Sequence, residues 1–146
     1  MSISSFQDYV DAISEFRTGN EVIWFRGHSV ENYQLMPGYY RQNLQTSEAT
    51  LMNKFKQNAS LMVDNAPKDE FDWMFLMQHY GAPTRLLDWS DSALVALYFC
   101  CSSKPDENGA IWLLKPVAMN KAANIHDDSD VGYLPSFQDE VLTGYK

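Results

Sequence analysis

The chain is poor in the residues on which several classes of protein depend. Of its 146 residues only 11 are Lys or Arg, against 19 that are Asp or Glu, and the formal net charge is −8. A surface that binds duplex nucleic acid needs clustered cations that displace counterions from the phosphates. We therefore expect no duplex nucleic acid as a partner. No run of about 18 apolar residues is present, so no membrane span is predicted either.

Cysteine is equally scarce, with only two residues, Cys100 and Cys101, which are neighbours in the sequence. Adjacent residues of a helix point in different directions, so we expect no disulfide between them. No Cys-x-x-Cys or His-x-x-x-His spacing occurs, and no metal site is predicted. The N-terminus has neither the basic nor the apolar region of a signal peptide. These absences predict a soluble, cytoplasmic protein with reduced cysteines.

Apolar and aromatic side chains, in contrast, are abundant. Hydrophobic residues make up 45% of the sequence and aromatic residues 14%, which is enough for one core and argues against disorder. Ser4 or Ser5 is the candidate cap of the first helix, and Ser47 opens the second. Apolar residues at helical spacing predict helices at 6–16, 47–62, 71–80 and 93–99.

Two of these helices have marked ends. Gly81 is expected just beyond the third helix, as its C′ residue, and Pro83 prevents the helix from continuing. Ser90 or Asp91 is the expected cap of the fourth helix. Because that helix is apolar almost all round, it is predicted to be buried.

Two short apolar runs predict strands. Residues 22–25 lie between Gly19 and Gly27 and are expected to form a buried strand that ends before Arg26. Residues 110–115 predict a second strand, ended by Pro116, whereas 33–40 predicts an ordered loop. The expected fold class is α+β, a small mixed sheet flanked by about four helices. Two strands do not complete a sheet, so either 35–36 and 86–87 add short strands or the chain is an incomplete copy of a larger fold.

Several segments resemble the FRG domain family, which is named for a Phe-Arg-Gly tripeptide, here at 25–27. The segments are Trp-Phe-Arg-Gly-His-Ser at 24–29, Leu-Met-Pro at 35–37 before Arg41, Gln-His-Tyr-Gly-Ala-Pro-Thr-Arg-Leu-Leu-Asp-Trp-Ser at 78–90, and Ala-Leu-Tyr-Phe at 96–99. The resemblance implies a mixed α/β domain, found mostly in bacteria and their phages. We therefore expect one FRG-type domain at 1–146, with its best-supported core at 6–116 and a weakly ordered or truncated tail at 117–146.

The polar residues of these segments are the candidate site. Arg26 can fork onto a phosphate or form an ion pair with Asp88. Arg85 is expected to face a helix C-terminus or a ligand. His79 is either a general acid or base or a cation favoured by the helix dipole. Trp89 either stacks on a ligand ring or belongs to the core.

The order of these features is also similar to that of ADP-ribosyltransferases. In those enzymes a first-strand Arg holds the NAD phosphates, and a later Glu, often in Gln-x-Glu, stabilises an oxocarbenium-like state. Gln138-Asp139-Glu140 has that spacing, although the Ser-Thr-Ser motif of those enzymes is absent. The candidate catalytic residues are therefore Arg26, His79 and Glu140, and NAD is the candidate cofactor.

Two classes of function are compatible with this pattern. The first is a polar cleft that binds a phosphate-bearing ligand and carries out NAD-dependent transfer or hydrolysis. The second is a non-catalytic module that senses a nucleotide or binds a protein partner, which the acidity, the aromatic residues and the seven Met would suit. In both, the candidate ligand-binding residues are Gly27, His28, Gln78, Tyr80, Thr84, Arg85, Asp88, Trp89 and Ser90.

Overall fold

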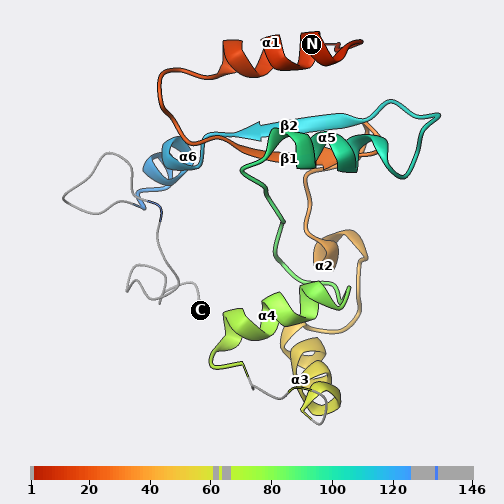
Figure 1. Ribbon diagram of the computed structural model, residues 1–146. Helices are drawn as coiled ribbons and strands as arrows, with labels where there is room; N and C mark the ends of the chain where they lie inside the picture. The colour runs from red at the N-terminus through yellow and green to blue at the C-terminus, as the bar shows by residue number, and fades with distance from the viewer. Residues whose placement is uncertain (1, 61–62, 64–66, 126–133, 135–146) are drawn as a thin grey trace. The chain divides into compact units, whose positions relative to one another are not determined.

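The computed structural model describes residues 2–60, 63, 67–125 and 134. The chain divides into two compact units whose segments alternate along the sequence. Unit 1 comprises Met1–Asn32 and Trp89–Leu134, and unit 2 comprises Tyr33–Asp88 and Pro135–Lys146. The described residues contain six helices and a two-stranded antiparallel sheet, which confirms the predicted α+β class (Figure 1).

Unit 1 is built on the strands β1 (Trp24–His28) and β2 (Ala110–Leu114). Ser90 forms an isolated bridge with Phe25, whose N–H donates to the Ser90 carbonyl at 2.7 Å. The Phe25 carbonyl accepts in turn from the Ser90 N–H. Because the N–H and the carbonyl of Phe25 both bond to Ser90, this bridge lies on the edge of β1 away from β2. The β1–β2 register pairs Trp24 with Leu114, Phe25 with Leu113, Arg26 with Trp112, Gly27 with Ile111 and His28 with Ala110.

Three helices belong to the same unit: α1 (Phe6–Phe16), α5 (Ala93–Cys101) and α6 (Pro116–Ala122). The Tyr9 hydroxyl donates to the Ala93 carbonyl at 2.9 Å, which joins α1 to the start of α5. Burial raises the pKa of this hydroxyl. The core consists of Ile23, Phe25 and Ala96, with Ile13, Ala93, Ile111 and Leu113 packed against them.

The start of α1 is fixed by a capping box. The Ser5 hydroxyl accepts from the Asp8 N–H at 3.1 Å, and the Asp8 carboxylate accepts from the Ser5 N–H at 3.0 Å. Of the two candidate caps, Ser5 is therefore the cap. The backbone N–H of Ser4 and the hydroxyls of Ser5 and Ser4 stabilise the carboxylate and lower the pKa of Asp8.

Unit 2 contains α2 (Gly38–Arg41), α3 (Glu48–Ala59) and α4 (Glu70–His79). Ser47 caps α3 as predicted, and Asp69 caps α4 through the Asp72 N–H. Methionine forms the centre of the core, where its flexible side chain fills irregular space. The buried residues are Met52, Met74 and Met77, with Leu51, Phe55, Phe71, Trp73, Ala82 and Leu86 packed around them.

The end of α4 confirms the predicted role of Gly81. Its φ is +76°, a conformation that glycine adopts without a steric penalty. The Gly81 N–H donates to the Gln78 carbonyl and the Ala82 N–H to the Met77 carbonyl, each at 2.9 Å. This is the Schellman pattern, and it satisfies the carbonyls that the last turn leaves open.

The prediction for the first strand was wrong in its boundaries. The strand runs from Trp24 to His28, so Arg26, Gly27 and His28 lie within it and not beyond its end. Ladder hydrogen bonds are made by the backbone, and polar side chains on one face do not interrupt them.

The predictions for the fourth helix also need correction. Ser92 caps α5, because Ser90 is held in its bridge with Phe25.

The predicted burial of α5 was wrong as well. Ala96 is buried, but Leu94, Val95, Tyr98 and Phe99 are exposed. Two helices were not predicted: α2 lies in the expected loop, and α6 begins at Pro116, a residue suited to the first turn. Within the described residues, neither 35–36 nor 86–87 forms a strand.

Candidate functional site

A cluster of three nitrogen-bearing side chains lies on one face of the sheet. Arg26 and His28 are two residues apart on β1 and share a face, and Trp112 lies opposite Arg26 in the register. The Arg26 Nε lies 3.2 Å from His28 Nε2, and the Trp112 Nε1 lies 3.2 Å from His28 Nδ1, each within hydrogen-bond distance. The His28 and Trp112 rings meet edge to face, with centroids 6.2 Å apart.

The protonation chemistry of His28 makes this cluster rich in donors. A neutral imidazole has one N–H and one acceptor nitrogen, whereas guanidinium and indole groups only donate. His28 can therefore accept from Arg26 or from Trp112, but not from both at once. Guanidinium and indole groups that share one face of the sheet offer the kind of N–H group that a phosphate accepts from.

Trp112 is the member of this cluster that sequence reasoning missed. The sequence places it in a strand, but its contact with His28 joins residues 84 positions apart. The alternation of β2 puts Trp112 on the opposite face from Ile111 and Leu113, both of which pack in the core. That alternation was the available signal, because it separates this indole from its core neighbours.

Gly27 lies between Arg26 and His28 and faces the other way. A Cβ on Gly27 would be 1.9 Å from the Ala96 carbonyl oxygen and 2.8 Å from the Cys100 nitrogen, both in the backbone of α5. The residue therefore has a clear packing role, which is to let α5 approach the strand. Its predicted contact with a ligand stays a prediction.

Trp89 and Ser90 complete the predicted residues of unit 1. Trp89 is half-buried. The Ser90 backbone pairs with Phe25, and its hydroxyl accepts from the Ser92 N–H at 3.0 Å. Ser90 thus links β1 to the start of α5.

In unit 2 Thr84 is the centre of a second polar network. This buried residue donates its hydroxyl hydrogen to the Gln78 amide oxygen and accepts from the Leu86 N–H at 3.2 Å. Its carbonyl accepts from the Tyr39 N–H at 3.0 Å. The Gln78 amide in turn donates to the Asp88 carboxylate at 2.8 Å, so the network orients that carboxylate.

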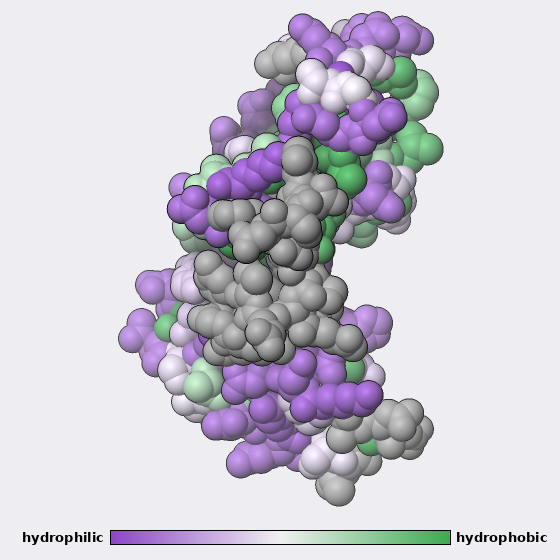
Figure 2. Space-filling view, turned by 90° about the vertical axis from the view of Figure 1, so that its left-hand side faces the viewer, coloured by the Kyte–Doolittle hydropathy of each residue, from purple (hydrophilic) through white to green (hydrophobic). Residues whose placement is uncertain are grey.

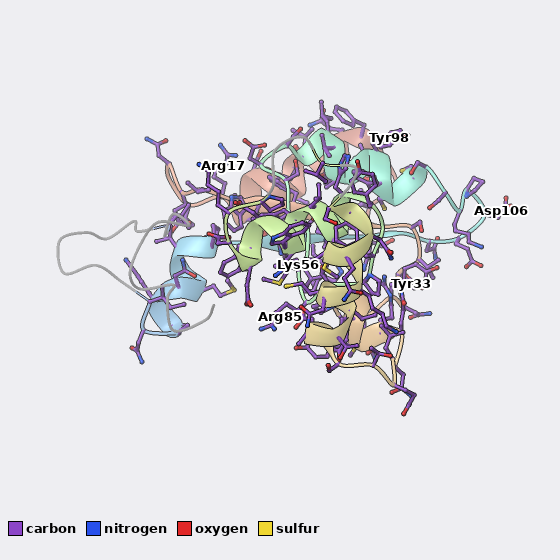
Figure 3. The ribbon with its side chains drawn as sticks, turned by 90° about the horizontal axis from the view of Figure 1, so that it is seen from below. Arg17, Tyr33, Lys56, Arg85, Tyr98 and Asp106 are labelled. Atoms are coloured by element: carbon purple, nitrogen blue, oxygen red, sulfur yellow. The ribbon has the colours of Figure 1, made fainter. Side chains whose placement is uncertain are left out.

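Arg85 forms an ion pair with Glu48 in the first turn of α3 (Figure 3). Its Nε donates to Glu48 Oε2 at 2.6 Å and its backbone N–H to Oε1 at 3.2 Å. The hydrogen bond with Glu48 raises the pKa of Arg85. Of the two partners predicted for Arg85, the helix C-terminus was wrong, because Glu48 lies at the N-terminal end of α3. The ligand stays a prediction.

His79 and Tyr80 end α4, and both are exposed. Their rings meet edge to face with centroids 5.3 Å apart. His79 also lines an open groove of about 440 Å³, which places it beside apolar side chains and two charged ones. The other residues lining this groove are Val63, Pro67, Lys68, Asp72, Phe75 and Leu76.

The predicted site residues are divided between the two units. Unit 1 holds Arg26, Gly27, His28, Trp89 and Ser90, and unit 2 holds Gln78, His79, Tyr80, Thr84, Arg85 and Asp88. The predicted ion pair of Arg26 with Asp88 would join the units and stays a prediction. Glu140, like His126, lies outside the described residues.

Two kinds of feature are absent from the described residues. No helix among them is long and apolar enough to cross a membrane. In the same part of the chain, no three His, Cys, Asp or Glu side chains are grouped so as to hold a metal ion.

Comparison with known proteins identifies one family. The model of the FRG domain matches residues 21–109, which is more than half of the chain. The matched region contains the Phe-Arg-Gly tripeptide of β1 and the whole segment from Gln78 to Ser90. Searches of curated proteins and of solved structures found no match.

Proposed function

The chain belongs to the FRG domain family, and on that basis we propose that it binds a phosphate-bearing ligand through Arg26 and the side chains around it. The observation that carries the proposal is the placement of the Arg26 guanidinium on one face of β1, beside His28 and opposite Trp112. A guanidinium is always charged, and its planar fork matches the geometry of a phosphate.

Trp112 suggests which phosphate compounds fit. Its side chain is partly exposed, and it lies beside the guanidinium that would hold the phosphate. An indole face stacks well on a flat ring such as adenine or nicotinamide. A nucleotide with both a ring and a pyrophosphate, such as NAD, would therefore use both features.

The chemistry we propose is NAD-dependent transfer or hydrolysis. The bond between nicotinamide and ribose breaks, and the nicotinamide leaves with the electron pair. Water or an acceptor group then bonds to the ribose carbon and loses its proton to a base. In this proposal Arg26 holds the pyrophosphate, Glu140 stabilises the oxocarbenium-like charge, and His79 is the candidate base.

Binding is tested by thermal unfolding in the presence of NAD, ADP-ribose, ATP or inorganic pyrophosphate. A ligand that binds the folded chain should raise the Tm with its concentration, by mass action. Arg26→Lys keeps the charge but loses the fork, so the affinity should fall about tenfold or more. Arg17→Lys is the matched control, because Arg17 is exposed at the end of α1. No Tm shift with any of these ligands would refute the binding proposal.

Turnover is tested separately, by the release of nicotinamide from NAD. Arg26→Lys should abolish release, whereas Arg17→Lys should not change it. Release at wild-type rates from Arg26→Lys would rule out the role of Arg26. Binding of NAD without release would favour the second candidate function, a non-catalytic module that senses a nucleotide.

The exposed apolar side of α5 favours protein binding as a further non-catalytic role. Protein partners commonly meet at surfaces rich in aromatic residues.

We also propose that the protein is located in the cytoplasm, which is supported by Cys100 and Cys101, both of them free thiols. Fractionation of cells that produce the tagged chain tests this location.

A further inference from the structure

We propose that α5 pairs with the α5 of a second copy of this chain. The helix packs its small residue Ala96 against β1. Four larger apolar side chains are exposed, on two successive turns: Leu94 (62%) and Val95 (42%), then Tyr98 (65%) and Phe99 (56%). Positions separated by three and four residues share a face of a helix. The four side chains therefore form one apolar surface. Tyr98 is labelled in Figure 3, and Figure 2 shows, from another side, hydrophobic residues (green) exposed at the molecular surface.

Charge favours a second copy as the occupant of this surface. Two chains of net charge −8 repel each other, so their contact is favoured at a surface that is uncharged or carries complementary charges. All nine residues of α5 are uncharged. The nearest charged residue before the helix is Asp91 and the nearest after it is Lys104, and both are exposed. An antiparallel pair of α5 helices would bring each Asp91 to the same end of the interface as the Lys104 of the other copy.

The helix dipoles also favour an antiparallel arrangement, because the positive end of each lies near the negative end of the other. The four side chains are centred between Val95 and Tyr98, so a twofold axis at that point brings Leu94 against Phe99 of the second copy. Such an interface is self-complementary and closed, as most homodimers are.

The available area is sufficient for a small dimer interface. The four α5 side chains expose roughly 450 Å² on the scale of aromatic and aliphatic burial. Two copies would therefore bury roughly 900 Å² in total, which is the size of a weak, transient interface and not of a permanent one.

This inference does not depend on the ligand proposal. Gly27 turns toward α5, whereas Arg26 and His28 lie on the opposite face of β1. Dimer formation and nucleotide binding are therefore measured separately, and either can fail without the other.

Sedimentation equilibrium from roughly 1 to 500 μM protein, the range of weak to moderate dimers, tests the proposal. The wild-type chain should show a monomer–dimer equilibrium, and Tyr98→Glu should raise the dimer dissociation constant about 30-fold or more. Tyr40→Glu is the matched control. Tyr40 is 57% exposed, and its ring meets a neighbouring aromatic ring edge to face, as that of Tyr98 does.

The charges at the helix ends give a second test that does not disturb packing. Asp91→Lys should weaken the dimer, because two lysines then meet at each end, and adding Lys104→Asp should restore it. A chain that stays monomeric over the whole range overturns the proposal. The proposal also fails if Tyr98→Glu and Tyr40→Glu weaken the dimer equally, or if adding Lys104→Asp to Asp91→Lys does not restore the dimer. In either case another surface forms the contact.

Discussion

Replacing Gly27 with alanine should force α5 away from β1. The new Cβ would lie 1.9 Å from the Ala96 carbonyl oxygen and 2.9 Å from the Ala96 carbonyl carbon, where ordinary contacts begin near 3.4 Å. Both atoms belong to the helix backbone, so a change of rotamer cannot relieve the overlap. The helix would have to move by more than 1 Å and loosen its contacts with Ile23 and Phe25 in the core.

The expected cost follows from this geometry. Overpacking a core costs about 1–3 kcal/mol when side chains can adjust. Because a backbone is obstructed at Gly27, we expect a loss of about 3 kcal/mol or more in the free energy of unfolding. For a chain of this size that loss lowers the Tm by about 6–12 °C. Thermal unfolding followed by circular dichroism measures it.

Two matched variants separate the steric effect from the loss of glycine itself. Gly38→Ala should leave the Tm nearly unchanged, since its new Cβ would come no closer than 3.7 Å to any atom. Gly109→Ala would meet the Cys100 Sγ at 2.3 Å, an overlap that Cys100→Ala should partly relieve. Cys100→Ala should not rescue Gly27→Ala. A Gly27→Ala chain that unfolds at the wild-type temperature would refute the steric argument.

Two further predictions concern polar groups. Thr84→Val should lower the free energy of unfolding by about 1–3 kcal/mol, because it removes the hydroxyl that bonds to Gln78 and to the Leu86 N–H. Thr84→Ser keeps a hydroxyl and should retain most of the stability. Denaturant unfolding measures both variants. The Ser4 and Ser5 donors lower the pKa of Asp8. The carboxylate therefore stabilises α1 above the ordinary pKa of an Asp side chain, about 3.8, and this stabilisation is lost as the pH falls through the lower pKa of the folded chain. Asp8→Asn should flatten the acid limb of a pH titration of helicity below pH 5, and an unchanged limb would contradict the capping box.

The features that sequence alone predicted well are local. The caps at Ser5 and Ser47 and the C′ residue Gly81 depend on hydrogen bonds within a few residues, and all three were found as expected. Residue type and order are enough to specify such motifs.

The features that sequence did not predict depend on distant partners. The apolar composition of α5 predicted burial, but burial depends on how much of a helix the neighbouring elements cover, and β1 covers only its small side around Ala96. The extension of β1 through His28 required β2 as a partner, and the register with β2 also brings Trp112 to His28. Pairing between strands so far apart leaves no local trace in the sequence.

The position of the segment Tyr33–Asp88 between the two strands of unit 1 has a consequence for synthesis on the ribosome. Trp24 pairs with Leu114, and at typical elongation rates roughly 5–20 s pass between these two residues. In that interval the segment Tyr33–Asp88 is completed, with the contacts between α3 and α4 that form its core. The nascent chain thus carries β1 without its β2 partner for seconds, while unit 2 has its own core residues at hand to fold first.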